Sequence, residues 1–339
     1  MFKIQSSTLA LAGAVLVSTV ASATIYAAGV DLVTEDFAQP PSTRGWQVFG
    51  DTNLFQWNQA GQNLAVTWDS SKPNSFFYHP LGRMLDRSND FTLTFDLVLN
   101  DIAIGTDPGM PGTFEIALGL INLSKATNTD FLRGTGFNSP DLAEFDYFPD
   151  SGYGATVAAT LISDTNEFNS GGYGFPLELT TNDLFHVQMH FDVATQSLTT
   201  TMTRNGQPFG PIPDAFLGTN FSDFHVDCLA ISSYSDAGQD PAYAGSILAH
   251  GILDNLSLGV PLPAGTLTGG FSSGGFEVRF DSLTNWLYTL ERTKDFSSWD
   301  DIPPAVNGTG GELELSDTNG PAGAAFYRVK AAPGVQPGL

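Results

Sequence analysis

The chain has 339 residues, of which 14% are charged, and its 36 acidic residues outnumber its 13 lysines and arginines. The formal charge of −23 argues against nucleic acids and anionic membranes as partners, because a strongly negative field repels polyanions. Cations and neutral sugars fit this field better, and the single cysteine, Cys228, excludes an intramolecular disulfide.

The first residues follow the pattern of a secretory leader. Lys3 precedes the apolar stretch "LALAGAVLVSTV", and small residues follow it up to Ala23. This order predicts a signal peptide over residues 1–23. The apolar run is shorter than the roughly 20 residues that a spanning helix needs, so we expect no membrane span. We therefore expect a secreted, extracellular or cell-surface protein, with the periplasm as the alternative.

Alternating apolar and polar residues predict strands throughout the chain. Residues 91–99, 113–121, 186–193 and 197–206 alternate or are rich in β-branched and aromatic residues, and clusters of Gly, Pro, Asn and Asp separate such runs. Long amphipathic helical patterns are missing. We therefore expect an all-β protein built as an antiparallel jelly-roll β-sandwich.

A change of composition near residue 260 predicts a domain boundary. The stretch "LSLGVPLPAGTLTGG" ends in a connector rich in Pro and Gly. We expect a jelly-roll domain over residues 31–260, a linker over 261–270, a small β-sandwich-like module over 271–331 and a tail over 332–339. The module has too few strands to bury more than a thin core, so we interpret it as a folded appendage.

Three segments resemble the concanavalin A-like lectin/glucanase superfamily. They are "EDF" at 35–37, the paired strands "FHVQMHFDVATQSLTTTMTRNG" at 185–206 and "ILDNLSL" at 252–258. The resemblance covers residues 31–260 and implies a jelly roll that binds or cleaves glycans. The C-terminal stretch "YTLERTKDFSSWDDI" with "FYRVKA" resembles a small β-module at the ends of secreted bacterial proteins.

The stretch "LAEFDYFPDSG" at 142–152 carries the main candidate site. On a strand, Glu144 and Asp146 share one face, opposite Phe145. "EFDYFPD" is similar to the legume-lectin metal loop. That similarity implies a structural calcium held by the side chains of Glu144, Asp146 and Asp150 and the carbonyl of Phe148. The Asp and His that continue the family pattern are absent, because about Ala155 and Thr160 stand there.

The same acids also resemble the signature of laminarinase-type glycoside hydrolases. By that comparison Glu144 is the nucleophile and Asp146 its helper, but Phe148 and Pro149 stand where the acid/base Glu belongs. Retaining hydrolysis needs two carboxyl groups about 5 Å apart, so the sequence leans against catalysis. A plain solvated strand face is a third interpretation of these acids.

Other residues that could carry chemistry are few. Tyr78, near a predicted strand end, is a candidate sugar-binding aromatic, whereas Trp68 shares an apolar strand face and is expected in the core. His186 and His190 share a strand face, where we expect exposed or hydrogen-bonded histidines rather than metal ligands.

From these patterns we predict a secreted, non-catalytic protein that binds a glycan or a cell-surface polysaccharide, with a structural calcium. A laminarinase-like hydrolase or a polysaccharide lyase, and a structural adhesin or envelope protein without a dedicated ligand, are the alternatives. The sugar and the oligomeric state stay open.

Overall fold

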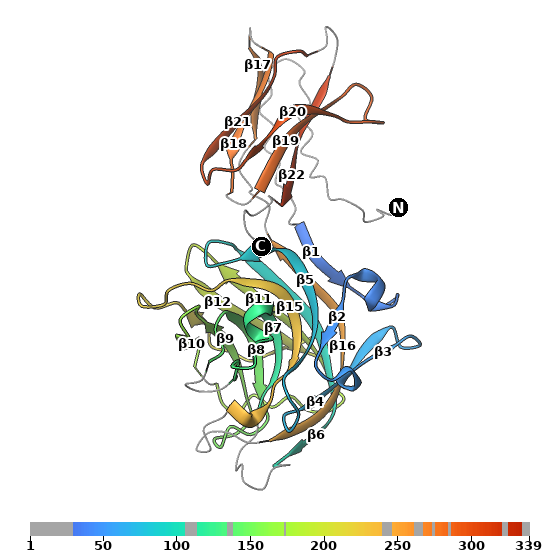
Figure 1. Cartoon of the computed structure of the whole chain (residues 1–339), viewed down its shortest axis with the longest axis vertical. Helices are drawn as coiled ribbons and strands as arrows, with labels where there is room; N and C mark the ends of the chain where they lie inside the picture. The colour runs from blue at the N-terminus through green and yellow to red at the C-terminus, as the bar shows by residue number, and fades with distance from the viewer. Residues whose placement is uncertain are drawn as a thin grey trace. The chain divides into compact units, whose positions relative to one another are not determined.

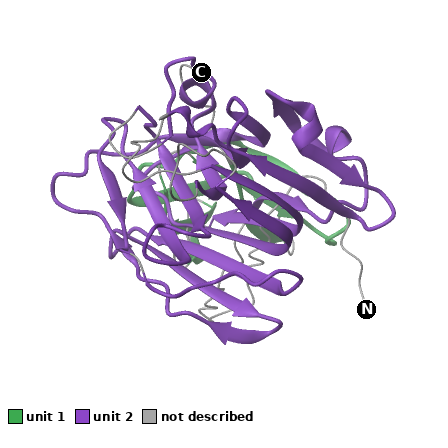
Figure 2. Cartoon of the chain, turned by 90° about the horizontal axis from the view of Figure 1, so that it is seen from below, with its two compact units in different colours: residues 1–30, 261–339 green, residues 31–260 purple. Residues whose placement is uncertain are grey.

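The computed structural model describes residues 30–105, 114–133, 138–172, 174–238, 246–260, 267–272, 275–283, 286–320 and 325–333. The predicted signal peptide lies outside these residues. Two compact units divide the chain, one comprising residues 31–260 and the other containing residues 261–339 (Figure 2).

The larger unit contains two antiparallel sheets (Figure 1). In the first, the order is β13-β12-β11-β6-β16-β4-β3, with β1 paired to β16 and β14 to β12. Its strands are β1 (Val30–Glu35), β3 (Phe55–Asn58), β4 (Asn63–Asp69), β6 (Phe91–Ile104), β11 (Leu184–Asp192), β12 (Ser197–Arg204), β13 (Gln207–Phe209), β14 (Ala215–Phe216) and β16 (Ile247–Val260).

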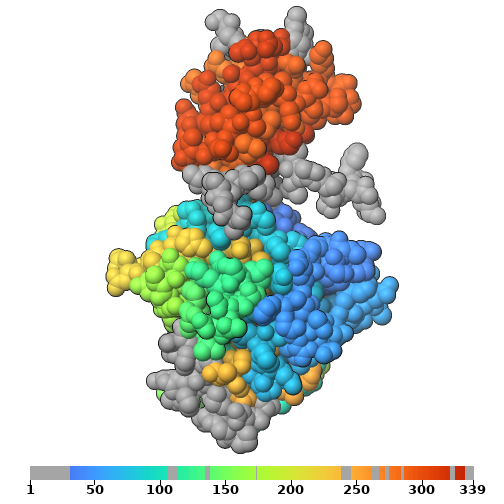
Figure 3. Space-filling view, viewed as in Figure 1, coloured from blue at the N-terminus to red at the C-terminus, as the bar shows by residue number. Residues whose placement is uncertain are grey.

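The second sheet has the order β10-β9-β8-β7-β15-β5-β2. Its strands are β2 (Gln47–Phe49), β5 (Ser75–Leu85), β7 (Ile116–Ile121), β8 (Leu142–Phe148), β9 (Thr156–Ile162), β10 (Phe168–Ser170) and β15 (Val226–Ser233). Figure 3 shows one face of this unit, on which the blue surface of the N-terminal segments lies beside green surface from the middle of the chain. The described helices of this unit are single turns: η1 (Pro41–Arg44), η2 (Thr52–Leu54), α1 (Leu123–Ala126) and η3 (Asp236–Gly238).

Alternation along the strands builds the core between the two sheets. Along β6 the odd-numbered residues from 91 to 99 are buried and the even-numbered ones are half-buried. Phe95 on β6 meets Phe145 on β8 edge to face, with 5.4 Å between the ring centroids. Trp68 is only 1% exposed, which confirms its predicted place in the core. The prediction of an all-β antiparallel sandwich is confirmed.

The segments that carried the superfamily resemblance lie in or next to strands of the first sheet. The strand that begins the unit, β1, pairs with its last strand, β16. The predicted long hairpin forms β11 and β12, which pair in register from Phe185 with Arg204 to Asp192 with Ser197. The larger unit is therefore an antiparallel jelly-roll β-sandwich, the fold class that the resemblance implied.

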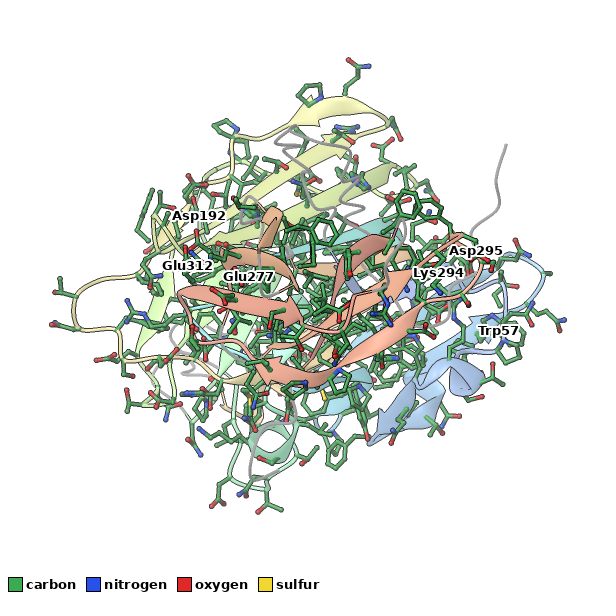
Figure 4. The ribbon with its side chains drawn as sticks, turned by 90° about the horizontal axis from the view of Figure 1, so that it is seen from above. Trp57, Asp192, Glu277, Lys294, Asp295 and Glu312 are labelled. Carbon is green, nitrogen blue, oxygen red and sulfur yellow. The ribbon has the colours of Figure 1, made fainter. Side chains whose placement is uncertain are left out.

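The smaller unit contains two three-stranded antiparallel sheets, β17-β18-β21 and β20-β19-β22. Phe276 and Tyr327 stack between them, with 3.9 Å between ring centroids. Figure 4 labels Glu277, at a half-buried position of β18, and Glu312, at an exposed position of β21. The strands are β17 (Thr268–Ser272), β18 (Gly275–Asp281), β19 (Trp286–Thr293), β20 (Asp300–Asn307), β21 (Glu312–Asp317) and β22 (Phe326–Pro333).

Two of these strands were not predicted. β17 is rich in glycine and begins at Thr268, inside the range predicted as a linker. β20 contains Pro303 and Pro304, which usually mark a break, but it is an edge strand, where proline is tolerated. In the part of the chain that the structure describes, no helix has the length and apolar character needed to cross a membrane.

Candidate carboxylate–arginine centre

Strand β8 places the predicted acids on one face of the second sheet. Glu144 lies opposite Gly119 of β7, and Asp146 lies opposite Ala117. Since Phe145 points between the two sheets, Glu144 and Asp146 point away from them, onto the outer face of this sheet. Both are nevertheless fully buried, at 0% exposure. The interpretation as a solvated strand face is therefore wrong for these two acids.

Small residues on the neighbouring strands leave room for the acids. Ala117 and Gly119 on β7 and Ala158 on β9 lie beside them in register. A Cβ atom at Gly119 would lie 2.3 Å from the carbonyl oxygen of Ala143 and 2.6 Å from the Cα of Glu144. The absence of a side chain at residue 119 is therefore what allows β7 to approach the backbone of β8 at Glu144.

Arg133 fills the space in front of the acids. Its Nε lies 3.1 Å from Oε2 of Glu144 and 3.1 Å from Oε1 of Glu115, a residue just before β7. Its Nη2 donates to Oδ2 of Asp146 at 2.9 Å. Arg133 is 3% exposed and Glu115 is 2% exposed. One guanidinium thus joins three buried carboxyl groups, a set we call the carboxylate–arginine centre.

Aromatic side chains cover the centre. The hydroxyl of Tyr234 donates a hydrogen bond to Oε1 of Glu144, and the guanidinium carbon of Arg133 lies 5.9 Å from the centroid of the Tyr234 ring. Phe131 stacks on Tyr234 at 6.1 Å, and both rings meet Phe76 of β5 edge to face. This cover keeps water away from the charged groups.

The three acids are buried beside a single positive charge, and their pKa values are raised. Desolvation raises the pKa of Glu144 to about 7, although Arg133 acts in the opposite direction. Desolvation likewise raises the pKa of Glu115 well above its usual range and raises that of Asp146. The three carboxylates raise the pKa of Arg133, so it stays charged despite its burial. One fixed cation faces three acids, and the raised pKa values of the acids favour protonation, which lowers the excess negative charge.

The donor set of the centre does not fit a calcium ion. The ligand oxygens of Glu115, Glu144 and Asp146 lie within 4.8 Å of one another, the spacing of a cation site. However, nitrogens of Arg133 already lie 2.9 to 3.1 Å from these oxygens. A calcium ion needs 6 to 8 oxygens at about 2.3 to 2.6 Å. At this position it would also be repelled by the buried, positively charged guanidinium of Arg133.

The remaining residues of the predicted site lie elsewhere. Asp150 follows β8, and its Oδ1 accepts a hydrogen bond from the backbone N–H of Gly152 at 2.9 Å, as in an Asx turn. Phe148 is half-buried at the end of β8. The hydroxyl of Tyr78, on β5, donates to Oε1 of Gln47 at 3.0 Å. Calcium binding by these residues and sugar binding by Tyr78 stay predictions.

Sequence reasoning missed Glu115, Arg133 and Tyr234. An acid inside the apolar run "TFEIALGLI" was a usable signal for Glu115, because such an acid must find a partner when it is buried. Arg133 lies outside the strands, and nothing in its local sequence shows which strand face it covers. Their meeting depends on the pairing of β7, β8 and β15.

The two histidines on β11 lie within hydrogen-bonding distance of groups on β6. Nδ1 of His186 lies 2.7 Å from Oδ1 of Asp96, and Nδ1 of His190 lies 3.0 Å from the hydroxyl of Thr92. Each ring has its own partner on β6.

Comparison with solved structures finds distant similarities. A PL-14 alginate lyase from Aplysia kurodai is 11% identical, with a TM-score of 0.43, over 68% of this chain and 100% of the lyase. A legume lectin-like domain from Entamoeba histolytica is 9% identical, with a TM-score of 0.41, over 68% and 97%. A seed lectin from Lotus tetragonolobus is 11% identical, with a TM-score of 0.38, over 67% and 97%. At these identities the likeness concerns the fold alone. No family model and no curated protein sequence matches the chain.

Replacing Arg133 by methionine should lower the free energy of unfolding by about 3 to 5 kcal/mol, because it leaves buried carboxyl groups without their cation. Urea unfolding followed by fluorescence measures the loss. The matched control is Arg279→Met, which breaks an ion pair with Glu314 whose side chains are 53% and 46% exposed. That control should cost less than about 1 kcal/mol. Equal losses in the two variants would contradict a special role for Arg133.

The free energy of unfolding should also depend on pH through the proton that Glu144 holds in the folded protein. Its pKa is raised from 4.5 to about 7 on folding, so the folded protein holds a proton that the unfolded chain releases between these values. The stabilisation from this group is full below about pH 4.5 and is lost as the pH rises through about 7. Glu144→Gln has no proton to lose and should lack this part of the pH dependence. Urea unfolding at a series of pH values measures it.

The control for that experiment is Glu178→Gln, because Glu178 is exposed. Its unfolding free energy should change with pH as the wild type's does. A Glu144→Gln profile parallel to the wild type would show that Glu144 holds no such proton.

Proposed function

We propose that the protein is a secreted carbohydrate-binding protein that does not cleave its ligand. The observation that carries this proposal is that Arg133 binds both acids of the laminarinase-like motif, Glu144 and Asp146, while both stay fully buried. A catalytic carboxylate must touch the sugar. Here the guanidinium and the ring of Tyr234 occupy the space that a sugar would need.

Binding to a neutral glycan agrees with the charge of the chain and with the superfamily resemblance. The formal charge of −23 disfavours polyanions but places no penalty on neutral sugars. A leader of the type found at residues 1–23 would deliver the protein to the exterior, where polysaccharides are available.

One observation favours the hydrolase alternative. Glu115 supplies the further carboxyl group that the sequence motif lacks, and the pKa of Glu144 is raised to about 7, as expected of a proton donor. For catalysis, the side chains of Arg133 and Tyr234 would have to leave the centre, exposing three acids that lack any other cation among the described contacts. The binding function needs no such rearrangement.

The two functions give different results with the same substrates. Incubation of the full chain with soluble β-glucans, mannans, xylans and galactans should show binding by affinity electrophoresis but no release of reducing ends and no new unsaturated ends. Reducing-end release that disappears in Glu144→Gln would establish the hydrolase instead. The absence of binding to every polysaccharide would favour the structural adhesin alternative.

We also propose that Arg133 takes the place of the structural calcium expected from the lectin-like motif. A chelator should then leave the melting temperature of the wild type unchanged, because Arg133 rather than an ion neutralises these acids. In Arg133→Ala, three acids lose their cation, and added calcium should raise the melting temperature. A wild type that melts earlier in chelator, with the shift abolished by Glu144→Ala/Asp146→Ala, would place calcium at these acids.

A further inference from the structure

An interruption in strand pairing opens one edge of the first sheet. β13 pairs with Met202–Arg204 at one end of β12, and β14 pairs with Ser197 and Leu198 at the other. Among the strands that the structure describes, neither covers residues 199–201 on this edge. Residues 210–214 connect β13 to β14 across the interruption.

A groove of about 450 Å³ occupies the interruption. Its polar lining residues are Thr199, Thr200, Thr201 and Asp214, and its apolar lining residues include Phe209 and Ile212. This volume lies within the range of about 300 to 1,000 Å³ that is usual for small-ligand sites. The groove is therefore large enough for one or two sugar rings.

An exposed aromatic residue, Phe216, follows two residues after Asp214 of the groove lining. Phe216 is 60% exposed and pairs with Ser197, so it lies on the same face of the sheet as Thr199 and Thr201. Gln188 of β11 lies opposite Thr201 on this face and is also exposed. The face thus combines a flat apolar ring with hydroxyl and amide groups, which is how proteins hold the C–H face and the hydroxyls of a sugar.

One buried polar atom lacks a partner at the groove. Thr200 faces the interior of the sandwich with Leu198 and Met202, and it is 3% exposed. Its hydroxyl oxygen has no hydrogen-bond partner among the described residues. An unpaired buried hydroxyl costs about 1 to 3 kcal/mol.

The charged residues that line the groove favour a neutral ligand over an anionic one. None of its lining residues is a lysine, an arginine or a histidine, and Asp214 adds a negative charge. Anionic sugars such as uronates would meet repulsion without any compensating cation. A neutral saccharide can instead donate its hydroxyls to the carboxylate of Asp214 and to threonine oxygens.

We propose that the open edge of β12, between β13 and β14, is a binding subsite for a neutral saccharide, with Phe216 as the ring platform and Asp214 as the main acceptor. This inference rests on the carbohydrate-binding function proposed above and names its site and ligand class. It places the sugar on the sheet opposite to the one that carries the carboxylate–arginine centre.

Isothermal titration of the full chain tests the subsite, with neutral oligosaccharides of glucose, mannose, xylose and galactose and an oligogalacturonate as probes. Phe216→Ala and Asp214→Asn should each weaken binding of the preferred neutral probe by about tenfold, as expected for a lost ring contact or charged hydrogen bond. The oligogalacturonate should not bind. The matched control is Phe271→Ala in the other unit, since Phe271 is 57% exposed, and its affinity should equal that of the wild type.

Both groove variants alter side chains that are at least partly exposed, so their melting temperatures should stay close to that of the wild type. Neutral-probe binding that survives unchanged in both variants would overturn the subsite but leave the carbohydrate-binding function intact. Failure of the wild type to bind any neutral probe would overturn both. Oligogalacturonate binding that is tighter than neutral binding would contradict the proposed ligand class.

Discussion

The ion pairs between the guanidinium of Arg133 and three buried carboxyl groups are the interaction on which the second sheet depends. Removing a carboxylate from water is costly, and a buried acid survives only with a counter-ion, hydrogen bonds or a proton. Glu115, Glu144 and Asp146 use all three means. The small residues on the strands beside β8 leave space for these side chains. The aromatic residues that cover them exclude water.

The same ion pairs explain why Glu144 and Asp146, which resemble both a lectin metal loop and a glucanase signature, neither bind calcium nor cleave sugars in the proposed account. A lectin-like calcium and a glucanase-like sugar would both need the outer face of β8, and Arg133 already occupies it. With this face closed by Phe131, Arg133 and Tyr234, the open groove at β12 becomes the better place for a ligand. Its threonines and Asp214 present hydroxyl and carboxylate groups where strand pairing is interrupted.

The sequence predicts the parts of this molecule that depend on local pattern. Alternation located β6, β11 and β12, and it placed Glu144 and Asp146 on one face. What it could not predict depends on contacts distant in the chain. The burial of the acids depends partly on Tyr234, which lies 90 residues beyond Glu144. The groove arises from the gap between two short strands that pair with β12. β20 was missed because an edge position makes its prolines acceptable, and edge position is a property of the sheet order.

A double-mutant cycle between Arg133 and Glu144 tests the central claim most directly. The free energies of unfolding of the wild type, Arg133→Met, Glu144→Gln and the double variant give the coupling between the two side chains. The account predicts that the double variant is more stable than the sum of the single losses implies, by at least about 1 kcal/mol. Losses that simply add would show that Arg133 does not hold Glu144 in the buried centre.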